Sequence, residues 1–306
     1  MTEDEFLEKL FSRLPPPPRE LVIPPGDDCA GLRIGEDRLL LVAVDQLIGA
    51  RHYPAGPGAM EPELAGRKLL ARNLSDIAAM GGEPLYCLVA AGLGPLHDEN
   101  WLQRFFDGII ELGRQYGVIM IGGDLGATMN DDVASLTIIG QARETHVLRR
   151  RGAKPGDILF ATGSFGSSLS TGHHLVFEPR CREGQWIARS GFARAMIDVS
   201  DGLLLDAGRM CRASGVGLRI DVGSIPLRSP ETTSREALTD GEDYELLFAV
   251  PEGDSDKLQR EWPFRGLSLT RIGEFTSFAG EVVDEKGEPL SADHPGYDHF
   301  QSVRRA

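Results

Sequence analysis

The chain has 306 residues, of which 41% are hydrophobic and 25% are charged, and this composition is typical of a folded globular protein rather than a disordered one. The length corresponds to about two domains. With 32 basic and 46 acidic residues the net charge is −14, which disfavours nucleic acids and anionic membranes as partners.

The N-terminal sequence MTEDEFLEKLF is acidic and lacks the basic and apolar segments of a secretory signal. No apolar run approaches the length that spans a membrane. The four cysteines (Cys29, Cys87, Cys181 and Cys211) have no C-x-x-C spacing, which is typical of reduced thiols rather than of disulfides or a zinc site. We therefore expect a cytoplasmic protein.

The first half of the chain is expected to form a sheet with helices. A short helix at 2–13 precedes the proline run at 15–18, which cannot be helical and is expected to be extended. Short apolar runs predict strands, and apolar residues at helical spacing predict helices. The expected elements are strands at 38–44, 85–93, 118–122 and 134–142, and helices at 62–80 and 98–115.

The segment RRRGAKPGD at 149–157 contains the turn signal Lys-Pro-Gly-Asp, which places a domain boundary nearby. We expect an N-terminal domain over 1–147 and a C-terminal domain over 148–306. The second half again mixes the two kinds of element, so the predicted fold class is α+β. Its expected elements are strands at 158–163, 217–222, 244–250 and 270–275, and a helix at 201–213.

One pattern recurs along the chain: an apolar run ends in an acid, or an acid is flanked by Gly and Ser. A buried carboxylate is costly unless it is paired or metal-bound, and several in one place repel each other. Sites made of oxygen ligands suit Mg²⁺, so convergence of these segments predicts a magnesium site. The segments are GDDCA (26–30), LLLVAVDQL (39–47), NLSDIAAMGG (73–82), IMIGGD (119–124), MIDVSDG (196–202) and LTDGEDYELLF (238–248).

Each acid taken alone also has a purely structural interpretation. Asp45 can start a loop, and Asp76 can pair with Arg72 four residues earlier on a helix surface. Asp198 and Ser200 can cap the helix that follows them. The functional interpretation therefore depends on the set rather than on any single member.

Several nucleotide-binding motifs are absent from the sequence. There is no G-x-x-x-x-G-K-[ST] loop, no kinase H-R-D loop and no G-x-G-x-x-G. The segment TGSFGSS at 162–168 follows an expected strand and is either a glycine turn or the start of a phosphate-binding helix.

The motifs GDDCA, NLSDIAAMGG, IGGD, RRGAKPGD, IDVSDGL, GEDYELLF and GYDHF together resemble those of thiamine-monophosphate kinases, in that family's order and over nearly the whole chain. The resemblance implies direct, in-line transfer of a phosphoryl group from ATP to thiamine monophosphate, giving thiamine diphosphate. It also implies two α+β domains and a homodimer. In that dimer the N-terminal sheets pair into a barrel, and the N-terminal domain carries the ATP, metal and dimer contacts.

The resemblance also implies roles for individual residues, and no covalent nucleophile is among them. Several Mg²⁺ ions would be held by Asp28, Asp45, Asp76, Asp124, Asp198 and Asp201. ATP would contact Gly123, Asp124, Arg150 and Ser200, and thiamine monophosphate would contact His52, Glu242 and Tyr297.

The sequence departs from the family pattern in three places. Ala43-Val44 stands where the family has two hydroxyl residues, Leu125-Gly126 follows the G-G-D motif in place of hydroxyl residues, and Asp240 replaces a glycine. We therefore expect Val44→Thr to lower the Mg²⁺ requirement. The departures leave a non-catalytic or altered nucleotide-binding member of the superfamily as an alternative.

Two sister enzymes are disfavoured by cysteine positions. A selenophosphate synthetase would carry a reactive Cys near the N-terminus, and no Cys precedes Cys29. A hydrogenase-maturation relative would end in Cys, whereas this chain ends QSVRRA.

Overall fold

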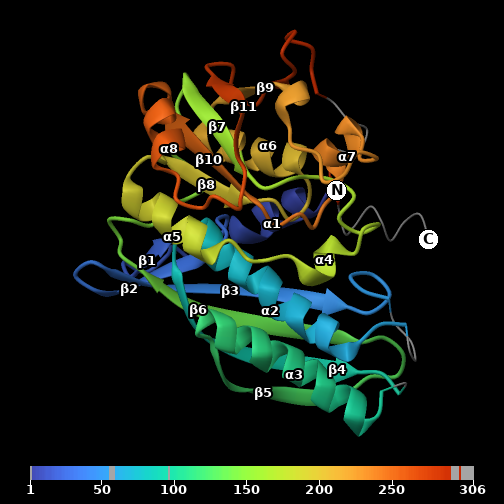
Figure 1. The fold of residues 1–306 in the computed structure, drawn as a ribbon. Coiled ribbons are helices and arrows are strands. Elements are labelled where there is room, and N and C mark those ends of the chain that lie inside the picture. Colours follow the sequence, from blue (N-terminus) through green and yellow to red (C-terminus); the bar gives the residue numbers. More distant parts are fainter. Residues whose placement is uncertain (1, 55–58, 96, 291–295, 298–306) are drawn as a thin grey trace.

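A computed structural model describes all residues except 1, 55–58, 96, 291–295 and 298–306, and it contains two six-stranded sheets with helices packed between and around them (Figure 1). The chain starts with helix α1 (Glu3–Phe11), which has a capping box between Thr2 and Glu5. The proline run at 15–18 that follows has no helix or strand assignment.

The first sheet has the strand order β1-β2-β3-β6-β4-β5. Its pairs are antiparallel except for β4 and β5, which run parallel. β3 and β6 pair over ten residues, from Leu39 opposite Ala142 to Ile48 opposite Val133. Its strands are β1 (Leu21–Ile23), β2 (Ala30–Gly35), β3 (Arg38–Ile48), β4 (Glu83–Leu93), β5 (Ile119–Ala127) and β6 (Val133–Ala142).

Two helices, α2 (Pro62–Ala79) and α3 (Glu99–Tyr116), run parallel to each other and cover one face of this sheet (Figure 1). Pro62 provides a fixed φ at the first position of α2, and Asp98 caps α3 by accepting the Trp101 N–H at 2.8 Å. The two helices approach closely because glycine lies where they touch. At Gly66, for example, a Cβ atom would lie 1.8 Å from the Phe105 carbonyl oxygen.

The second sheet has the strand order β12-β9-β11-β7-β10-β8, and only β12 and β9 pair in parallel. Its central strands are buried on both faces, so their sequences are continuous apolar runs rather than alternating ones. Its strands are β7 (Asp157–Thr162), β8 (Ala195–Asp198), β9 (Gly217–Ile220), β10 (Leu246–Pro251), β11 (Leu269–Thr276) and β12 (Val282–Val283).

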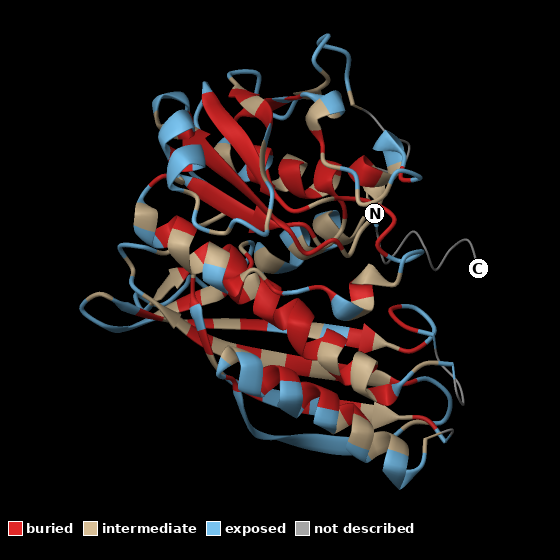
Figure 2. Cartoon of the chain, viewed as in Figure 1, coloured by how far each residue is buried: buried red, intermediate tan, exposed pale blue. Residues whose placement is uncertain are grey.

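The two sheets enclose a shared hydrophobic core (Figure 2). That core runs from the first sheet through α2 and α5 to Phe160 and Phe248 on the second sheet, while α6 and α7 cover the opposite face. The helices of this half are α4 (His173–Val176), α5 (Cys181–Ser190), α6 (Leu203–Ser214), α7 (Ser234–Thr239) and α8 (Ser255–Glu261), with 3₁₀ turns η1 (Val222–Ser224) and η2 (Glu252–Asp254). Helix α2 packs against both halves of the molecule. Side chains from the first and the second half therefore meet along this helix.

The predicted α+β class is confirmed, and every strand and helix expected from the sequence is present within a few residues of its predicted ends. The sequence analysis did not predict β1, β2, β8, β12 or helices α4, α5, α7 and α8, which are short or irregular in pattern. The domain boundary at 147/148 stays a prediction. Among the described residues, no helix combines the length and the apolar character needed to cross a membrane.

Candidate active site

Three predicted acids converge between the two halves of the molecule. Asp28 precedes β2, Asp76 lies near the end of α2, and Asp198 ends β8. One carboxylate oxygen of each lies within 4.8 Å of the others, and we call these three residues the acid cluster. The three acids come from a turn, a helix and the end of a buried strand, and they meet because α2 packs against β8.

The acid cluster holds more negative charge than its surroundings neutralise. Burial, followed by the charges of Asp45, Asp198 and Asp28, raises the pKa of Asp76 well above its usual value. Burial and then the charge of Asp28 raise the pKa of Asp198 in the same way, although Ser75 donates a hydrogen bond to it at 2.6 Å. Oδ2 of Asp28 is buried without a hydrogen-bond partner among the described residues. A divalent cation with oxygen preference fits this donor set.

Arginines pair with the predicted metal ligands. Arg150, predicted to contact ATP, donates to Oδ1 of Asp28 at 2.6 and 3.0 Å. Arg72, one turn before the acid cluster on α2, donates to Asp45 at 3.2 Å. The sequence analysis had weighed Arg72 as a partner of Asp76, but Asp45 is the acid that it contacts. Each guanidinium therefore neutralises one acid at the border of the cluster.

Asp201 is tied to the start of α6 by a second set of charges. Arg209 donates to Asp201 at 2.6 Å, to Asp206 at 2.7 Å and to Asp4 of helix α1 at 2.9 Å. Asp206 in turn accepts the backbone N–H groups of Ser200 and Asp201 at 3.1 and 3.0 Å. The 200–201 loop is thus held by its backbone, which leaves the side chain of Ser200 unconstrained by these bonds.

The loop at 200–201 also contacts both predicted substrate-binding segments of the second half. The Ser200 carbonyl accepts the Glu242 N–H at 2.7 Å. The Asp201 carbonyl accepts the Tyr297 N–H at 2.8 Å. The structure therefore brings Ser200, Glu242 and Tyr297 to one place, while positions 298–300 of the GYDHF motif lie outside the described residues.

Gly123 and Asp124 lie apart from these groups within one subunit. Both belong to β5, the exposed edge strand, whereas Asp45 belongs to β3. β6 and β4 lie between them, which corresponds to about 14 Å at the usual strand spacing. The single chain therefore does not add Asp124 to the acid cluster.

His52 and Glu242 meet around a buried lysine. Lys68 of α2 donates to the His52 carbonyl oxygen at 2.6 Å and to Oε2 of Glu242 at 2.7 Å, and it lies 2.7 Å from Nδ1 of His174. We call these four residues the lysine cluster. Burial would raise the pKa of Glu242, but its contact with His174 and the charges of Lys68 and Arg72 lower it to about 2.

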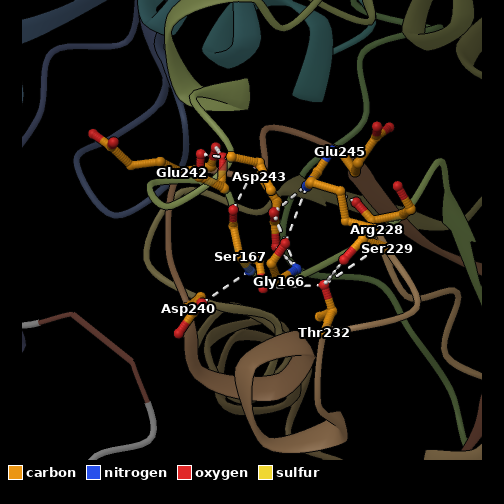
Figure 3. A network of polar contacts seen from close by, with 12 residues as sticks. Gly166, Ser167, Arg228, Ser229, Thr232, Asp240, Glu242, Asp243 and Glu245 are labelled. Carbon is orange, nitrogen blue, oxygen red and sulfur yellow. Dashed lines mark hydrogen bonds and ion pairs between the residues drawn. The ribbon is translucent and has the colours of Figure 1, made fainter.

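The glycine-rich segment after β7 is fastened by the acids of the 240–243 loop (Figure 3). Asp243 accepts the Gly166 N–H at 3.0 Å, and Asp240 accepts the Ser167 N–H at 2.9 Å. Arg228 donates to Asp243 at 2.7 Å and closes the network. These N–H groups are already bonded to carboxylates, so the segment is a turn and not the predicted alternative, a phosphate-binding helix start. Asp240, a departure from the family pattern, has a structural role in this turn.

The departure at Ala43-Val44 splits across the two faces of β3. Ala43 is buried on the helix-covered face, as is Leu41. Val44 is 65% exposed on the opposite face, and Asp45 returns to the helix side. The expectation that a hydroxyl at position 44 would serve the ion held by Asp45 is therefore wrong for a single subunit, because the two side chains point in opposite directions.

The sequence analysis did not predict four charged or polar residues that organise the site. Lys68 has no role in the expected pattern and Arg72 has only that of a partner for Asp76, yet both are buried. Lys68 and Arg72 are four residues apart and therefore lie on one face of the helix, and this spacing is the sequence signal that could have indicated a shared role. His174 and Arg209 lie in segments with no recognisable motif, and only the fold places them here.

Comparison with known proteins identifies the family of the chain. Residues 26–142 match the family AIR synthase related protein, N-terminal domain, and residues 154–285 match its C-terminal domain. The thiamine-monophosphate kinase of Escherichia coli (strain K12) is 35% identical to this chain, over 97% of the chain and 98% of the relative. That of Pyrococcus horikoshii is 34% identical over 90% and 91%.

Solved structures of the same kind superpose over nearly the whole chain. The crystal structure of thiamine-monophosphate kinase from Stenotrophomonas maltophilia K279a has a TM-score of 0.74 at 30% identity, covering 94% of this chain and 96% of that one. AaThiL complexed with AMPPCP and TMP has a TM-score of 0.78 at 26% identity, covering 98% and 97%. Hydrogenase maturation protein HypE in complex with ATP, at 20% identity and a TM-score of 0.68, shares the fold alone.

Proposed function

The chain belongs to the thiamine-monophosphate kinase family, and we propose that it transfers the terminal phosphoryl group of ATP to thiamine monophosphate, giving thiamine diphosphate. In this transfer an oxygen of the acceptor phosphate forms the new bond to phosphorus. The bond to the bridging oxygen of ATP breaks, and ADP leaves with that electron pair. The resemblance seen in the sequence is confirmed at the level of the family.

The acid cluster is the observation that carries the proposal. Two buried carboxylates and one half-buried carboxylate within 4.8 Å of each other destabilise an empty site and suit a site that receives cations. Asp28, Asp76 and Asp198 would hold Mg²⁺, and Asp45 and Asp201 stand at its border. Bound Mg²⁺ would supply the positive charge that offsets the repulsion between ATP and the acceptor phosphate.

The arginines of the site have a second role in this proposal. Arg150 pairs with Asp28 in the ligand-free protein. When a divalent cation takes over that acid, the guanidinium becomes available to the triphosphate, which is the role the sequence predicts for it. Arg150 and Ser200 would then bind ATP from opposite sides of the acid cluster.

The acceptor side is proposed to lie at the lysine cluster. The thiazolium ring of thiamine is permanently cationic, and Glu242 keeps its charge down to a pKa of about 2. Tyr297, 36% exposed and bonded through its backbone to Asp201, offers an aromatic face to a cation. His52, Glu242 and Tyr297 would therefore bind thiamine monophosphate.

The transfer is proposed to be direct. The four cysteines are buried, and burial raises the pKa of each, so none is a reactive thiolate. The phosphoryl group would pass in one in-line step, which inverts the configuration at phosphorus. A competent phospho-enzyme would contradict this step.

We also propose a homodimer through the first sheet. The face of this sheet opposite α2 and α3, together with the edge strand β5, exposes several large apolar side chains, and water-exposed apolar patches of this kind mark interfaces. Pairing of two such sheets into a barrel would cover them and the open edge of β5. The exposed residues are Ile34, Val44, Tyr86, Leu88, Ile119, Ile121 and Leu125.

The test is an assay of purified protein with ATP, Mg²⁺ and thiamine monophosphate, in which thiamine diphosphate is separated and quantified. Formation that requires all three supports the proposal. The alternative, a non-catalytic nucleotide-binding protein, predicts ATP binding without product. The acid cluster disfavours this alternative, because a protein without metal chemistry gains nothing from three repelling acids. Location in the cytoplasm stays a prediction.

A further inference from the structure

Lys68 is an unusual residue for its position. The chain has 5 lysines among its 32 basic residues, so arginine is its ordinary cation. The Lys68 side chain nevertheless has an exposed fraction of 0%, in the middle of helix α2. Lysines are almost never fully buried unless they are paired. Burial opposes its charge and lowers the pKa of Lys68 to about 8.

The contacts of Lys68 account for this choice. An ammonium group has three N–H donors and no acceptor. It is surrounded by three acceptors at 2.6 to 2.7 Å: the His52 carbonyl oxygen, Nδ1 of His174 and Oε2 of Glu242. Three converging acceptors suit a compact point charge, whereas a planar guanidinium would not reach all of them.

The three partners come from segments that are distant in the sequence. His52 follows β3 in the first half of the chain, His174 belongs to helix α4, and Glu242 lies in the loop before β10. Lys68 therefore joins both halves of the molecule at the proposed acceptor site. Glu242 also has a φ of +66°, a left-handed conformation that a non-glycine residue keeps only when its surroundings hold it.

The remaining atoms of these partners are oriented by the same contacts. The ion pair of Glu242 with Lys68 and its 3.2 Å contact with Nδ1 of His174 both use Oε2, and Oε1 makes no such contact with the described residues. Nδ1 of the His52 ring accepts the Ile48 N–H at 2.9 Å, so the neutral ring carries its proton on Nε2.

We infer that Lys68 is a positioning residue for the acceptor: by binding Oε2 of Glu242 and the His52 carbonyl, it presents Oε1 of Glu242 and the His52 ring to thiamine monophosphate. This inference rests on the proposed function. All three N–H groups of the ammonium are used within the protein, so Lys68 does not bind the phosphate itself. It acts through Glu242, and its loss should affect the acceptor and not ATP.

The experiment is a double-mutant cycle with Lys68→Met, Glu242→Gln and the double variant, measured as KM for thiamine monophosphate and for ATP. Loss of one partner of a buried charge pair should raise KM for thiamine monophosphate by about tenfold or more. KM for ATP should stay within about twofold, and Lys68→Met should add nothing further in the Glu242→Gln background. An unchanged KM for thiamine monophosphate in Lys68→Met, or independent effects that multiply in the double variant, would overturn the inference.

A matched control is Leu69→Met, the adjacent fully buried residue of α2, which should leave both KM values unchanged. Wild-type protein that forms no thiamine diphosphate would overturn the proposed function and the inference with it. Active wild-type protein with a normal Lys68→Met variant would overturn the inference alone.

If Lys68→Met does not fold, lysine-labelled wild-type protein provides a second test, because only five lysine signals must be assigned. The side-chain NMR signal of Lys68 should shift on addition of thiamine monophosphate and stay in place on addition of AMPPCP alone. A Lys68 signal that does not respond to thiamine monophosphate would contradict the inference.

Discussion

Two buried polar clusters lie along helix α2 and are built on opposite principles. The lysine cluster surrounds Lys68, and the acid cluster includes Asp76, eight residues or about 12 Å further along the helix. In the lysine cluster a cation from the protein meets three acceptors at 2.6 to 2.7 Å. In the acid cluster three carboxylates face each other, and Oδ2 of Asp28 has no partner among the described residues.

The difference separates a completed site from one that requires a ligand. A fully satisfied buried network is rigid and fixes geometry, which suits the recognition of one substrate. A buried set with surplus negative charge lowers the stability of the empty protein and raises its affinity for cations. The same helix therefore carries a satisfied cluster, which is the proposed acceptor site, and a cluster with surplus negative charge, which is the proposed metal site. The predictions below test whether the two clusters differ in this way.

The largest effect is expected in the acid cluster from Asp198→Asn. The change keeps the side-chain shape, removes one ligand charge and should lower kcat by about 10³-fold, the size of a lost electrostatic group in an active site. The same change relieves repulsion, so the melting temperature in metal-free buffer should rise by roughly 2–4 °C. Steady-state assays and thermal unfolding of one preparation measure both quantities.

The matched control for that variant is Asp157→Asn. Asp157 is also buried, but it is paired, accepting the Lys154 N–H at 2.8 Å and lying 3.7 Å from Arg194. Its substitution should lower the melting temperature and leave kcat unchanged. If Asp198→Asn also lowers stability, the acid cluster is not under charge repulsion and the contrast between the clusters fails.

A second large effect concerns Asp124, which is exposed and separate from the acid cluster within one subunit. Asp124→Asn should reduce activity by about 10²-fold or more if β5 of the proposed dimer completes the site of its partner. Its melting temperature should stay near that of the wild type, because no repulsion is relieved.

Mixing Asp124→Asn subunits with Asp198→Asn subunits shows whether Asp124 acts in the site of its own subunit or in that of the partner subunit. If Asp124 acts across the interface, each mixed dimer contains one intact site, and about a quarter of wild-type activity returns. Activity that remains absent after subunit exchange, verified by mass spectrometry of the mixed dimers, would place Asp124 and Asp198 in the same subunit's site.

A moderate effect is expected from pH. Burial is the largest influence that raises the pKa values of Asp27 and Asp206 to about 6, and it also raises those of Asp76 and Asp198 well above their usual value. The folded state then binds more protons than the unfolded state, so the free energy of unfolding of the metal-free protein should fall as pH rises from about 5 to 8. Denaturant unfolding across this range, with and without Mg²⁺, measures it. If Mg²⁺ does not reduce the fall in the free energy of unfolding, the pH dependence does not arise from a cation-binding site.

The sequence predicts the two clusters to different degrees. Asp198 ends an apolar run, and Asp28 and Asp76 stand in segments where acids follow Gly or Ser, so the pattern indicated all three. The same pattern included Asp124, which lies apart from the acid cluster within one subunit. His52 and Glu242 were expected only through the resemblance to the family. Lys68 was not expected, because a lysine within an amphipathic helix is usually solvated, and its burial depends on how α2 packs against the second half.

The fold was predictable for similar reasons and with similar gaps. The long apolar strands β3, β4 and β6 and helices α2 and α3 have clear periodicity. Short elements such as β1 and β8 are set by tertiary pairing, which a local pattern does not contain. The exposed apolar face of the first sheet needs the strand register to be recognised, because alternate residues of one run lie on opposite faces.

The smallest effect comes from that alternation at positions 43 and 44. Ala43 shares the helix-covered face of β3 with Asp45, whereas Val44 faces away. Ala43→Ser therefore places a hydroxyl on the side of the acid cluster, where it can replace a water in the ligand shell of a cation. Immobilising such a water costs up to ~2 kcal/mol, so the Mg²⁺ concentration for half-maximal rate should fall several-fold at most, with kcat unchanged at saturation. Val44→Thr is the matched control and should leave the Mg²⁺ dependence unchanged. If Val44→Thr lowers the requirement and Ala43→Ser does not, the cation is reached from the opposite face of the sheet, and the acid cluster alone does not define the metal site.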